Sequence, residues 1–425
     1  MITSPQIRIA YLVSQYPAAN HTFVLREILG LRALGFDVRV ASVRATDRPP
    51  AAQTQAERAE LQSTFYIKPA GLPGFLRAHA ATWWRLPGGY LRGLAAAIRL
   101  GAPHPRDIGF HLAYFAQAVV FGNWMRRHGL THVHSHFSST VAMLAARVFS
   151  VTWSATIHGP DEFKDPNRNH LKEKCASALF LVTISNFGRE QLERSSLPQD
   201  RDRIEVCRLG VDLSMFTPAL FRPHPEVFEI LFVGRLAPVK APQNLIAAVG
   251  ALIHDGRPVR LRLVGDGPLR ADLDQQVQAQ NLKDHVVLEG PLNQERVQDR
   301  LRAADIFAMA SLAEGIPVAL MEAMAMGIPC IATTLDGVFE LIENKVDGIL
   351  CPPVDIHALS QAIAQLMDAP ALRQELGRAG RRRVAAEYDI SRNISQLAEI
   401  FRSYLSDAQK ELPAVHPQKD EPVGR

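Results

Sequence analysis

The sequence predicts an α/β fold of two Rossmann-like, doubly wound domains that face a cleft. Short β-rich runs alternate with helix-length segments, and several runs are continuously apolar, as parallel strands are when helices cover both faces. The pattern breaks near 213–227, which holds three prolines, and then restarts. The expected strands are 8–14, 37–43, 132–137, 153–159, 178–185 and 204–210 before the break, and 229–236, 260–267, 285–290, 306–311, 329–333 and 348–353 after it.

This break divides the chain into an N-terminal domain over 1–215 and a C-terminal domain over 225–390. A helix over 391–407 follows, and we expect it to return to the N-terminal domain. The polar, proline-containing tail over 408–425 is expected to be disordered.

The composition is that of an ordinary globular protein. Hydrophobic residues make up 47% of the 425 residues and the net charge is only +4, so we expect no binding of nucleic acid by the molecule as a whole. The four cysteines form no CxxC pair, which indicates reduced thiols. The N-terminus lacks a signal-peptide pattern, and no stretch reaches the roughly 18 apolar residues of a transmembrane helix. The sequence therefore predicts a cytoplasmic protein.

Two cations lie in the loop after the run 229–236. In FVGRLAPVKAP, Gly234 ends the expected strand, and Arg235 and Lys240 precede Pro242, which suits the first turn of a helix. Cations at the carboxyl end of a strand, beside a helix N-terminus, suit a diphosphate. For this segment alone, a pair of solvated surface cations is an equally good interpretation.

The segment LVGDGPLRADL repeats the order of strand, glycine turn and helix. Gly265 and Gly267 would let the backbone approach a ligand closely, although many βα turns contain such a pair. Asp272 and Asp274 mimic a DxD metal motif, but residues two apart on a helix point away from each other, so we expect no metal there.

The most specific pattern is AEGIPVALMEAMAMGIP, in which Glu322 follows Glu314 by eight positions. Glu314 follows a strand, Pro317 can start a helix, and Glu322 lies within that helix among apolar neighbours. A carboxylate accepts two hydroxyl groups at once, which suits a vicinal diol of ribose or of a pyranose. Two plain surface acids are the alternative, which fits Glu322 poorly because an unpaired carboxylate in apolar surroundings is costly.

Taken together, GRLAPVK and EGIPVALMEAMAMGIP resemble the donor-binding signature of the retaining glycosyltransferases of family 4, which have the GT-B fold. The resemblance implies that Arg235 and Lys240 bind the donor diphosphate, that Glu322 binds the ribose, and that Glu314 contacts the transferred sugar. The further donor-binding candidates are Gly234, Gly265, Gly267, Pro317 and Val318.

The sequence departs from the family pattern at two places. Ala241 replaces the usual glycine after the lysine, and Ile316-Pro317 replaces a common Phe-Gly pair. The proline removes one backbone N–H that would otherwise face a phosphate or sugar.

In the first half, which the resemblance assigns to the acceptor, the loop Ala-Asn-His-Thr over 19–22 resembles the branch that assembles bacterial exopolysaccharides such as colanic acid. Asn20 and Thr22 are cleft candidates, and both are equally well explained as caps of the following helix. In TIHGPDEF, the resemblance places His158 beside the transferred sugar. A structural histidine at a strand end is the alternative.

Three histidines share one face of the expected strand 132–137. We expect no zinc on His132, His134 and His136, because no spaced carboxylate accompanies them, and His136 is instead a candidate at the cleft edge. Asp161 could orient the acceptor and Arg189 could reach the cleft.

Residues 73–100 are basic and aromatic. Arg77, Arg85, Arg92 and Arg99 recur at near-heptad spacing beside Trp83 and Trp84, in a pattern that suits a helical hairpin interrupted at Pro87-Gly88-Gly89. Such a face suits contact with anionic lipid at the inner face of the plasma membrane. Helices packed on their own domain with solvated arginines are an equally good interpretation.

We therefore hypothesise retaining sugar transfer without a metal ion or another cofactor. The donor would be a UDP- or GDP-linked sugar and the acceptor a saccharide or lipid-linked saccharide, in bacterial exopolysaccharide or cell-surface glycan synthesis. A nucleotide-sugar epimerase and a non-catalytic binding protein are the alternatives. An NAD-dependent dehydrogenase is disfavoured because Tyr11–His21 contains no glycine.

Overall fold

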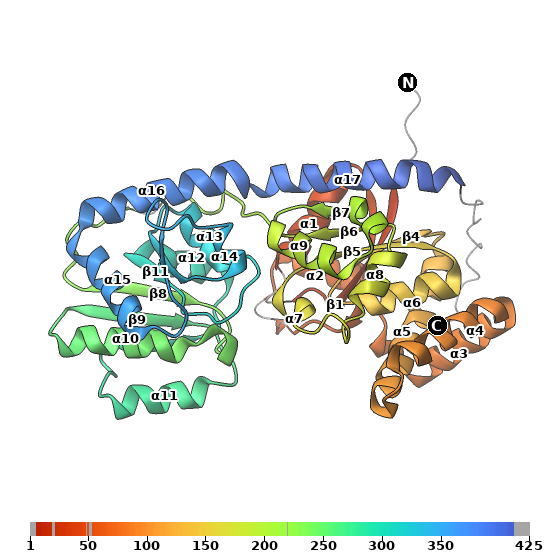
Figure 1. Ribbon diagram of the computed structural model, residues 1–425, viewed down its shortest axis with the longest axis horizontal. Coiled ribbons are helices and arrows are strands. Elements are labelled where there is room, and N and C mark those ends of the chain that lie inside the picture. Colours follow the sequence, from red (N-terminus) through yellow and green to blue (C-terminus); the bar gives the residue numbers. More distant parts are fainter. Residues whose placement is uncertain (1–5, 19–21, 48, 51–52, 219, 412–425) are drawn as a thin grey trace, which may run out of the picture. The chain divides into compact units, whose positions relative to one another are not determined.

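The computed structural model describes residues 6–18, 22–47, 49–50, 53–218 and 220–411. The chain forms two compact units (Figure 1). Unit 1 contains the chain up to Ile184, Gly188–Cys207 and the chain from Ile394 onward, and unit 2 contains Ser185–Phe187 and Arg208–Asn393.

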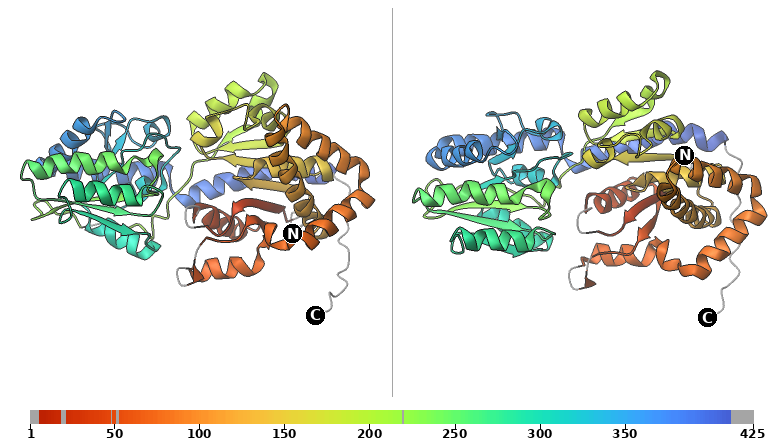
Figure 2. Two further views of the ribbon diagram at one scale, coloured as in Figure 1. Left: turned by 90° about the horizontal axis from the view of Figure 1, so that it is seen from below. Right: turned by 60° about the horizontal axis from the view of Figure 1, so that its bottom comes forward.

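Unit 1 is built on a seven-stranded parallel sheet with the order β3-β2-β1-β4-β5-β6-β7. Helices cover both faces of the sheet (Figure 2), and apolar side chains on both faces of its strands are buried beneath them. The strands are β1 (Arg8–Gln15), β2 (Asp37–Arg44), β3 (Phe65–Tyr66), β4 (His132–His136), β5 (Thr152–Ile157), β6 (Phe180–Thr183) and β7 (Ile204–Val206).

The helices of unit 1 divide between the two faces of this sheet. Leu12 and Val133 point into a core that they share with α5 and α6, whereas Tyr11 and His134 contact Phe401 of α17 on the other face. The helices are α1 (Thr22–Ala33), α2 (Gln55–Ser63), α3 (Gly71–Arg85), α4 (Pro87–Gly101), α5 (Pro105–Arg127), α6 (Ser139–Phe149), α7 (Pro160–Phe163), α8 (Leu171–Ser177), α9 (Asn186–Ser195) and α17 (Ile390–Glu411).

Unit 2 repeats the plan with a six-stranded parallel sheet, in the order β10-β9-β8-β11-β12-β13. The strands are β8 (Phe228–Val233), β9 (Val259–Val264), β10 (Val286–Gly290), β11 (Ile306–Ala308), β12 (Cys330–Thr333) and β13 (Ile349–Cys351). The helices are α10 (Pro242–His254), α11 (Arg270–Ala279), α12 (Gln294–Ala303), α13 (Val318–Ala325), α14 (Asp336–Phe339), α15 (Ile356–Asp368) and α16 (Pro370–Glu387). The predicted fold class, two doubly wound α/β domains, is confirmed.

All twelve expected strands are present, and the sequence missed only the two-residue β3. Several strands end earlier than expected; β8, for example, ends at Val233 instead of residue 236. The residues that follow β8 leave the sheet because their backbone groups bond a neighbouring loop: the N–H of Leu236 donates to the carbonyl of Asp266 at 2.9 Å.

The helical hairpin of unit 1 is present, but the predicted interruption at Pro87-Gly88-Gly89 is wrong. The break falls at Leu86, and Pro87 is the first residue of α4, where its missing N–H costs nothing. Gly89 lies inside α4, and a β-carbon at this position would approach the carbonyl oxygen of Val148 to 2.2 Å. The glycine therefore lets α4 lie directly against the end of α6.

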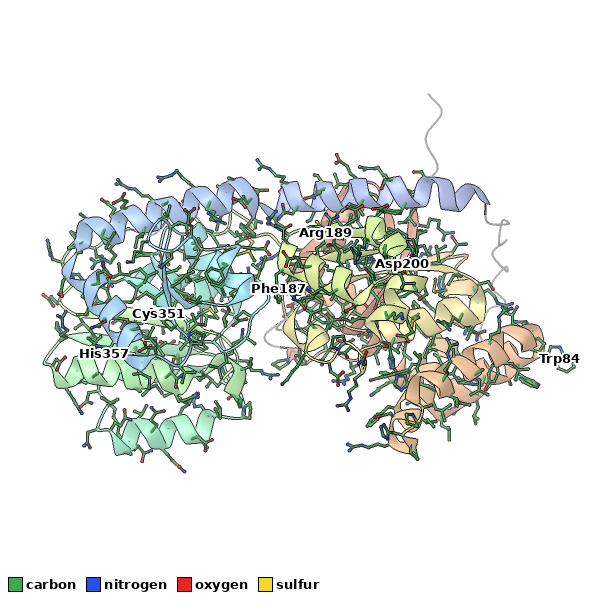
Figure 3. All side chains as sticks on the ribbon, viewed as in Figure 1. Trp84, Phe187, Arg189, Asp200, Cys351 and His357 are labelled. Carbon is green, nitrogen blue, oxygen red and sulfur yellow. The ribbon has the colours of Figure 1, made fainter. Side chains whose placement is uncertain are left out.

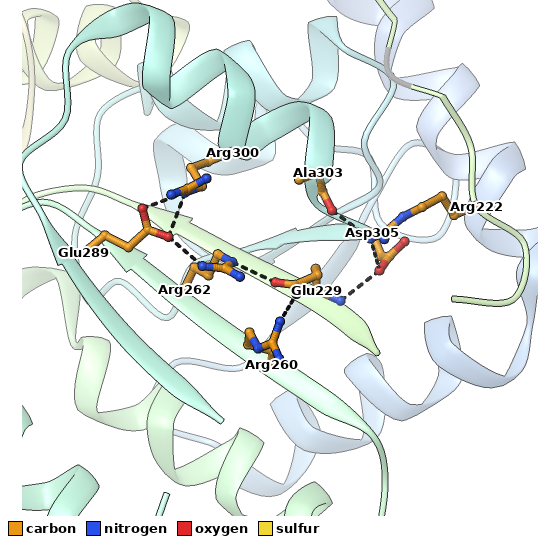
Figure 4. Close-up of polar contacts among 8 residues, drawn as sticks. All are labelled: Arg222, Glu229, Arg260, Arg262, Glu289, Arg300, Ala303 and Asp305. Atoms are coloured by element: carbon orange, nitrogen blue, oxygen red, sulfur yellow. Dashed lines mark hydrogen bonds and ion pairs between the residues drawn. The ribbon is translucent and has the colours of Figure 1, made fainter. Parts of the chain in front are cut away.

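Alternating charges cross the strands of unit 2 (Figure 4). Glu229 pairs with Arg260 and Arg262 at 2.9 Å each, and Arg262 also pairs with Glu289, which Arg300 of α12 contacts in turn. Hydrogen bonds and the opposite charge of Arg262 and Arg300 lower the pKa of the Glu289 carboxyl against the opposing effect of its burial. These arginines are already neutralised within the sheet, so they are not candidates for binding a diphosphate.

The four cysteines, Cys175, Cys207, Cys330 and Cys351, are buried and form no disulfide. No helix in the described part of the chain is long and apolar enough to cross a membrane.

We expect Gly265→Ala to destabilise unit 2 by about 2 kcal/mol or more. Its φ is +137°, and a β-carbon would lie 1.9 Å from the carbonyl oxygen of Gly234 on the adjacent strand end. Urea unfolding measures the loss. Gly109→Ala is the control, because this helical glycine faces open space; alanine there should be neutral or slightly stabilising. Equal stability of the two variants would contradict the prediction.

Candidate functional site

The loops after β8 and β11 meet at the carboxyl end of the sheet of unit 2, because these two strands are neighbours. The N–H of Leu312 donates to the carbonyl of Val239 at 2.8 Å, which joins the loops. The side chains of Lys240 and Glu314 lie at this junction. The Lys240 Nζ donates to Glu314 Oε1 at 2.5 Å and to Oε2 at 2.7 Å.

Glu314 is almost fully buried and its oxygens are well satisfied. Its side chain is 8% exposed, that of Lys240 is 23% exposed, and the hydroxyl of Ser311 donates to Glu314 Oε1 at 2.7 Å. Ser311 is held by Thr333 of β12, whose hydroxyl donates to the Ser311 carbonyl at 2.6 Å. The sequence expectation treated Lys240 and Glu314 as separate ligands of diphosphate and sugar, and it missed both their pairing and Ser311.

The other donor candidates surround this pair. Arg235 is exposed and makes no hydrogen bond or ion pair with the described residues. Pro317 caps α13, Val318 is its first residue, and Glu322 lies half-buried on the same helix. The loop before α13 is tightly packed, since a β-carbon on Gly337 would lie 1.8 Å from the Gly315 carbonyl oxygen.

The glycines of the loop after β9 have a structural role that the sequence did not reveal. A β-carbon on Gly267 would lie 2.3 Å from the Leu236 carbonyl oxygen, and Gly265 has the corresponding contact with Gly234. These glycines therefore bring the β9 loop against the backbone of the β8 loop, which carries Arg235. Close approach to a ligand is not needed to explain them.

In unit 1, the histidines of β4 form a buried ladder with hydroxyls of β5. His132 lies between Thr152 and Ser154, and His134 bonds Ser154 and Thr156. Burial lowers the pKa of His132 to about 3, and it holds the pKa of His134 well below its usual value. Both rings are therefore neutral at pH 7.

His136 closes this ladder and connects it to two other elements. Its Nε2 lies 3.0 Å from Glu27 Oε1 of α1, and its Nδ1 lies 2.8 Å from His158 Nε2, after β5. The hydroxyl of Tyr11 also donates to Glu27 Oε1, at 2.8 Å. Because a carboxylate only accepts, His136 donates through Nε2 and, when neutral, accepts from His158 Nε2–H. The chain of bonds therefore favours the His158 tautomer with its proton on Nε2.

The expectation that no carboxylate accompanies the histidines is wrong. Glu27, His134 and His136 come within the distances at which three ligands can share a metal ion. Glu27 was missed because it is 109 residues away in sequence from His136. The available signal was an acid between Val24 and Ile28 on the buried face of α1. The ring nitrogens of both histidines already have protein partners, so the arrangement is explained as a hydrogen-bond network.

His158 is held on several sides. Its backbone N–H donates to Glu162 Oε2 at 2.9 Å, and its ring stacks on Phe137 with centroids 4.5 Å apart. Burial raises the pKa of the Glu162 carboxyl, and the nearby Lys174 opposes that rise. The structure therefore brings His136 and His158 together, as it does Lys240 and Glu314 in unit 2.

The remaining candidates are not part of either cluster. Arg189 lies on α9, where its Nε donates to Glu193 at 2.8 Å on the exposed surface (Figure 3). Thr22 is the first residue of α1. Asn20 and the side chain of Asp161 lie outside the part of the chain that the structure describes.

Two parallel-sheet Rossmann-like units are the architecture of the GT-B fold. The sequence model of "Glycosyltransferase Family 4" matches residues 21–215, and that of "Glycosyl transferases group 1" matches residues 221–383. The chain is therefore a glycosyltransferase that combines a family 4 N-terminal domain with a group 1 C-terminal domain.

Relatives and solved structures agree with this assignment. A protein of Escherichia coli named as the colanic acid biosynthesis glycosyltransferase WcaL is 27% identical over 93% of this chain and 100% of its own length. The amylovoran biosynthesis glycosyltransferase AmsK of Erwinia amylovora is 27% identical over 93% and 99%. Anabaena HepE, solved with UDP and glucose, superposes with a TM-score of 0.71 at 17% identity and covers 94% of this chain and all of its own.

Acid should destabilise unit 1 through His132. Its pKa is about 3 in the folded state and about 6.5 when unfolded, so the unfolded chain binds more protons between these values. The free energy of unfolding should therefore fall by about 2 kcal/mol, from this residue alone, as the pH drops from 6.5 to 4.5.

Urea unfolding of His132→Gln at both pH values measures this contribution. The variant should lose part of the pH dependence, whereas His104→Gln, at an exposed site, should keep it. An unchanged pH dependence in His132→Gln would show that the histidine is not held neutral.

Proposed function

We propose that the protein transfers a sugar from a nucleotide-diphosphate sugar to a saccharide or lipid-linked saccharide during synthesis of a bacterial exopolysaccharide. The observation that carries the proposal is the pair of Lys240 and Glu314 at the carboxyl end of the unit 2 sheet, with the exposed Arg235 on the same loop as the lysine. Ligands of open α/β sheets bind at that edge. Relatives over most of the chain are named for colanic acid and amylovoran synthesis, and a further E. coli relative is named for UDP-Gal and a diphosphoundecaprenol-linked sugar.

The ion pair holds the ammonium of Lys240 in place, where it can also bind an anionic donor. An ammonium has three N–H donors, and Glu314 takes two of them in the ligand-free protein. In the proposal the third donor binds a phosphate oxygen, and Arg235 binds the same diphosphate from the open side of the loop. Glu314 Oε1 already accepts from Lys240 and Ser311, whereas Oε2 accepts only from Lys240 and can also accept a hydroxyl of the transferred sugar.

The helix α13 supplies the remaining donor contacts. Its first N–H groups, beginning at Val318, have no intrahelical acceptors, and the helix dipole favours an anion there. Pro317 and the glycines Gly234, Gly265 and Gly267 shape the backbone around this end. Glu322, one turn further along, is assigned to the ribose hydroxyls.

Unit 1 supplies the groups that act on the sugar and the acceptor. We assign His158 to the transferred sugar, held by His136 and Glu27 with its proton on Nε2. In this proposal the ring is neutral, which avoids placing a second positive charge beside an oxocarbenium-like transition state. Asn20, Thr22, Asp161 and Arg189 remain acceptor candidates.

The proposed reaction retains the anomeric configuration and uses no metal ion or other cofactor. The acceptor hydroxyl attacks the anomeric carbon from the face that the nucleoside diphosphate leaves. The new glycosidic bond forms as the bond to the phosphate oxygen breaks, and the hydroxyl proton passes to the departing diphosphate. Arg235 and Lys240 stabilise the charge on the leaving diphosphate, which is the role a metal ion would otherwise have. NMR of the product's anomeric configuration tests retention, and activity after treatment with a chelator tests independence from metal.

Arg235→Ala and Lys240→Ala should each lower kcat at least about 100-fold, because charge on the leaving group is stabilised in the transition state. Turnover is measured with UDP- and GDP-sugars chosen by ligand-induced thermal shift. Arg296→Ala is the control, since this arginine is exposed on α12, and it should leave kcat unchanged. Near-wild-type kcat in a folded Arg235 variant would overturn the assignment, and conversion of the donor without acceptor would indicate an epimerase.

We also propose that unit 1 binds the inner face of the plasma membrane through α3 and α4. Residues 61–106 contain no acidic residue and six basic ones. Trp84 is 86% exposed, Leu72 72% and Leu76 62%, and Figure 3 shows Trp84 projecting from the end of α3. Exposed apolar side chains among arginines without acids complement an anionic lipid surface.

Trp84→Ala should weaken binding to phosphatidylglycerol vesicles at least about threefold, because the indole ring would no longer enter the interface. Vesicle flotation measures the bound fraction, with phosphatidylcholine vesicles as the uncharged comparison. Leu220→Ala, at an equally exposed apolar residue of unit 2, should have no effect. Equal binding of both variants would rule out α3 as the contact.

A further inference from the structure

A cavity of about 320 Å³ opens in unit 1 at the carboxyl ends of β1, β2 and β4. Three cations and one carboxylate line it. Arg44 comes from the end of β2, Lys68 from the turn before α3, Lys174 from α8 and Glu162 from α7. The cavity therefore has an excess of positive charge, in the position where doubly wound sheets bind ligands.

Lys174 is the unusual member of this set. The residue is only 4% exposed, and its ammonium makes no hydrogen bond or ion pair with any residue that the structure describes. Burial lowers the pKa of Lys174, although the charge of Glu162 opposes this effect. The oxygen Oε2 of Glu162 accepts the N–H of His158. A buried ammonium without hydrogen-bond acceptors is costly, and an anionic ligand in the cavity would remove that cost.

The start of α6 forms the wall beside Lys174. Ser138, Ser139 and Thr140 line the cavity, and the side chain of Ser138 makes no capping bond. The first backbone bonds of the helix run from Val141 and Ala142 to the Ser138 carbonyl, so the preceding N–H groups have no intrahelical acceptor. With its dipole, this end of an 11-residue helix favours an anion.

We propose that this cavity binds a phosphate or diphosphate group of the acceptor. The inference rests on the proposed function and adds to it that the acceptor is a phosphate ester. A neutral saccharide needs none of these three cations, whereas lysine ammonium groups and a helix N-terminus are the donors that bind phosphate as a compact charge. A second cavity of about 550 Å³ shares Tyr114, Thr140 and Asn169 with the first, and it gives room for the rest of the acceptor.

Inorganic pyrophosphate, titrated by calorimetry into the full chain, tests the proposal. The wild-type protein should bind two pyrophosphates, one in each unit. The variant Arg44→Ala/Lys68→Ala, at two exposed positions, should lose one site with affinity reduced at least about tenfold. Lys174→Met should lose the same site, and Lys172→Ala, an exposed lysine of the same helix, should retain both.

Arg235→Ala separates this proposal from the proposed function, because it should remove only the site in unit 2. If Arg44→Ala/Lys68→Ala keeps full pyrophosphate binding, the phosphate cavity is wrong, whatever Arg235→Ala does. If Arg235→Ala keeps both sites, the donor assignment fails and the cavity stands. Tighter binding of glucuronate than of pyrophosphate at the unit 1 site would also overturn the proposal, since it would indicate a carboxylate sugar.

Discussion

The donor half of this protein depends on one ion pair, between Lys240 and Glu314. The two residues are 74 positions apart, and they meet because β8 and β11 are neighbours in the parallel sheet. Their carboxyl ends open at the same edge, and the bond from Leu312 to Val239 fixes the two loops. Without the lysine, Glu314 would be a nearly buried carboxylate with only the Ser311 hydroxyl as its partner. The pair therefore stabilises this edge of the sheet, and it places charged groups there.

Unit 1 also contains buried polar side chains that need hydrogen-bond partners, and most of these side chains are uncharged. Its sheet carries three histidines inside the core, and the hydroxyls of β5, Glu27 and the ring of His158 satisfy their nitrogens. Burial keeps His132 and His134 uncharged, so the core has no unpaired imidazolium. The network ends at His158 beside the open edge. The buried histidine His136 and the candidate His158 at the edge of the sheet therefore belong to one hydrogen-bond network.

Much of the fold was predictable because each signal is local. Apolar runs bounded by glycine and proline gave twelve strands, and Pro242 marked the first residue of α10. The ends of strands were less predictable. Strands β8 and β9 end where the backbones of their following loops form hydrogen bonds with each other, and the sequence of one loop does not reveal which loop will lie beside it. The predicted break of the hairpin was misplaced for a similar reason. Gly89 allows close contact with Val148 of α6, and it does not end a helix.

By itself, the sequence determined the alternation of strands and helices, the order of the two domains and the residue types of the donor loops. Those properties follow from periodicity and spacing along the chain. Only the tertiary structure decided that Glu314 is paired with Lys240, that Glu27 serves His136, and that Lys174 lies buried in a basic cavity. Side chains far apart in sequence become partners through strand order and helix packing, and burial then sets the cost of leaving any of them without one.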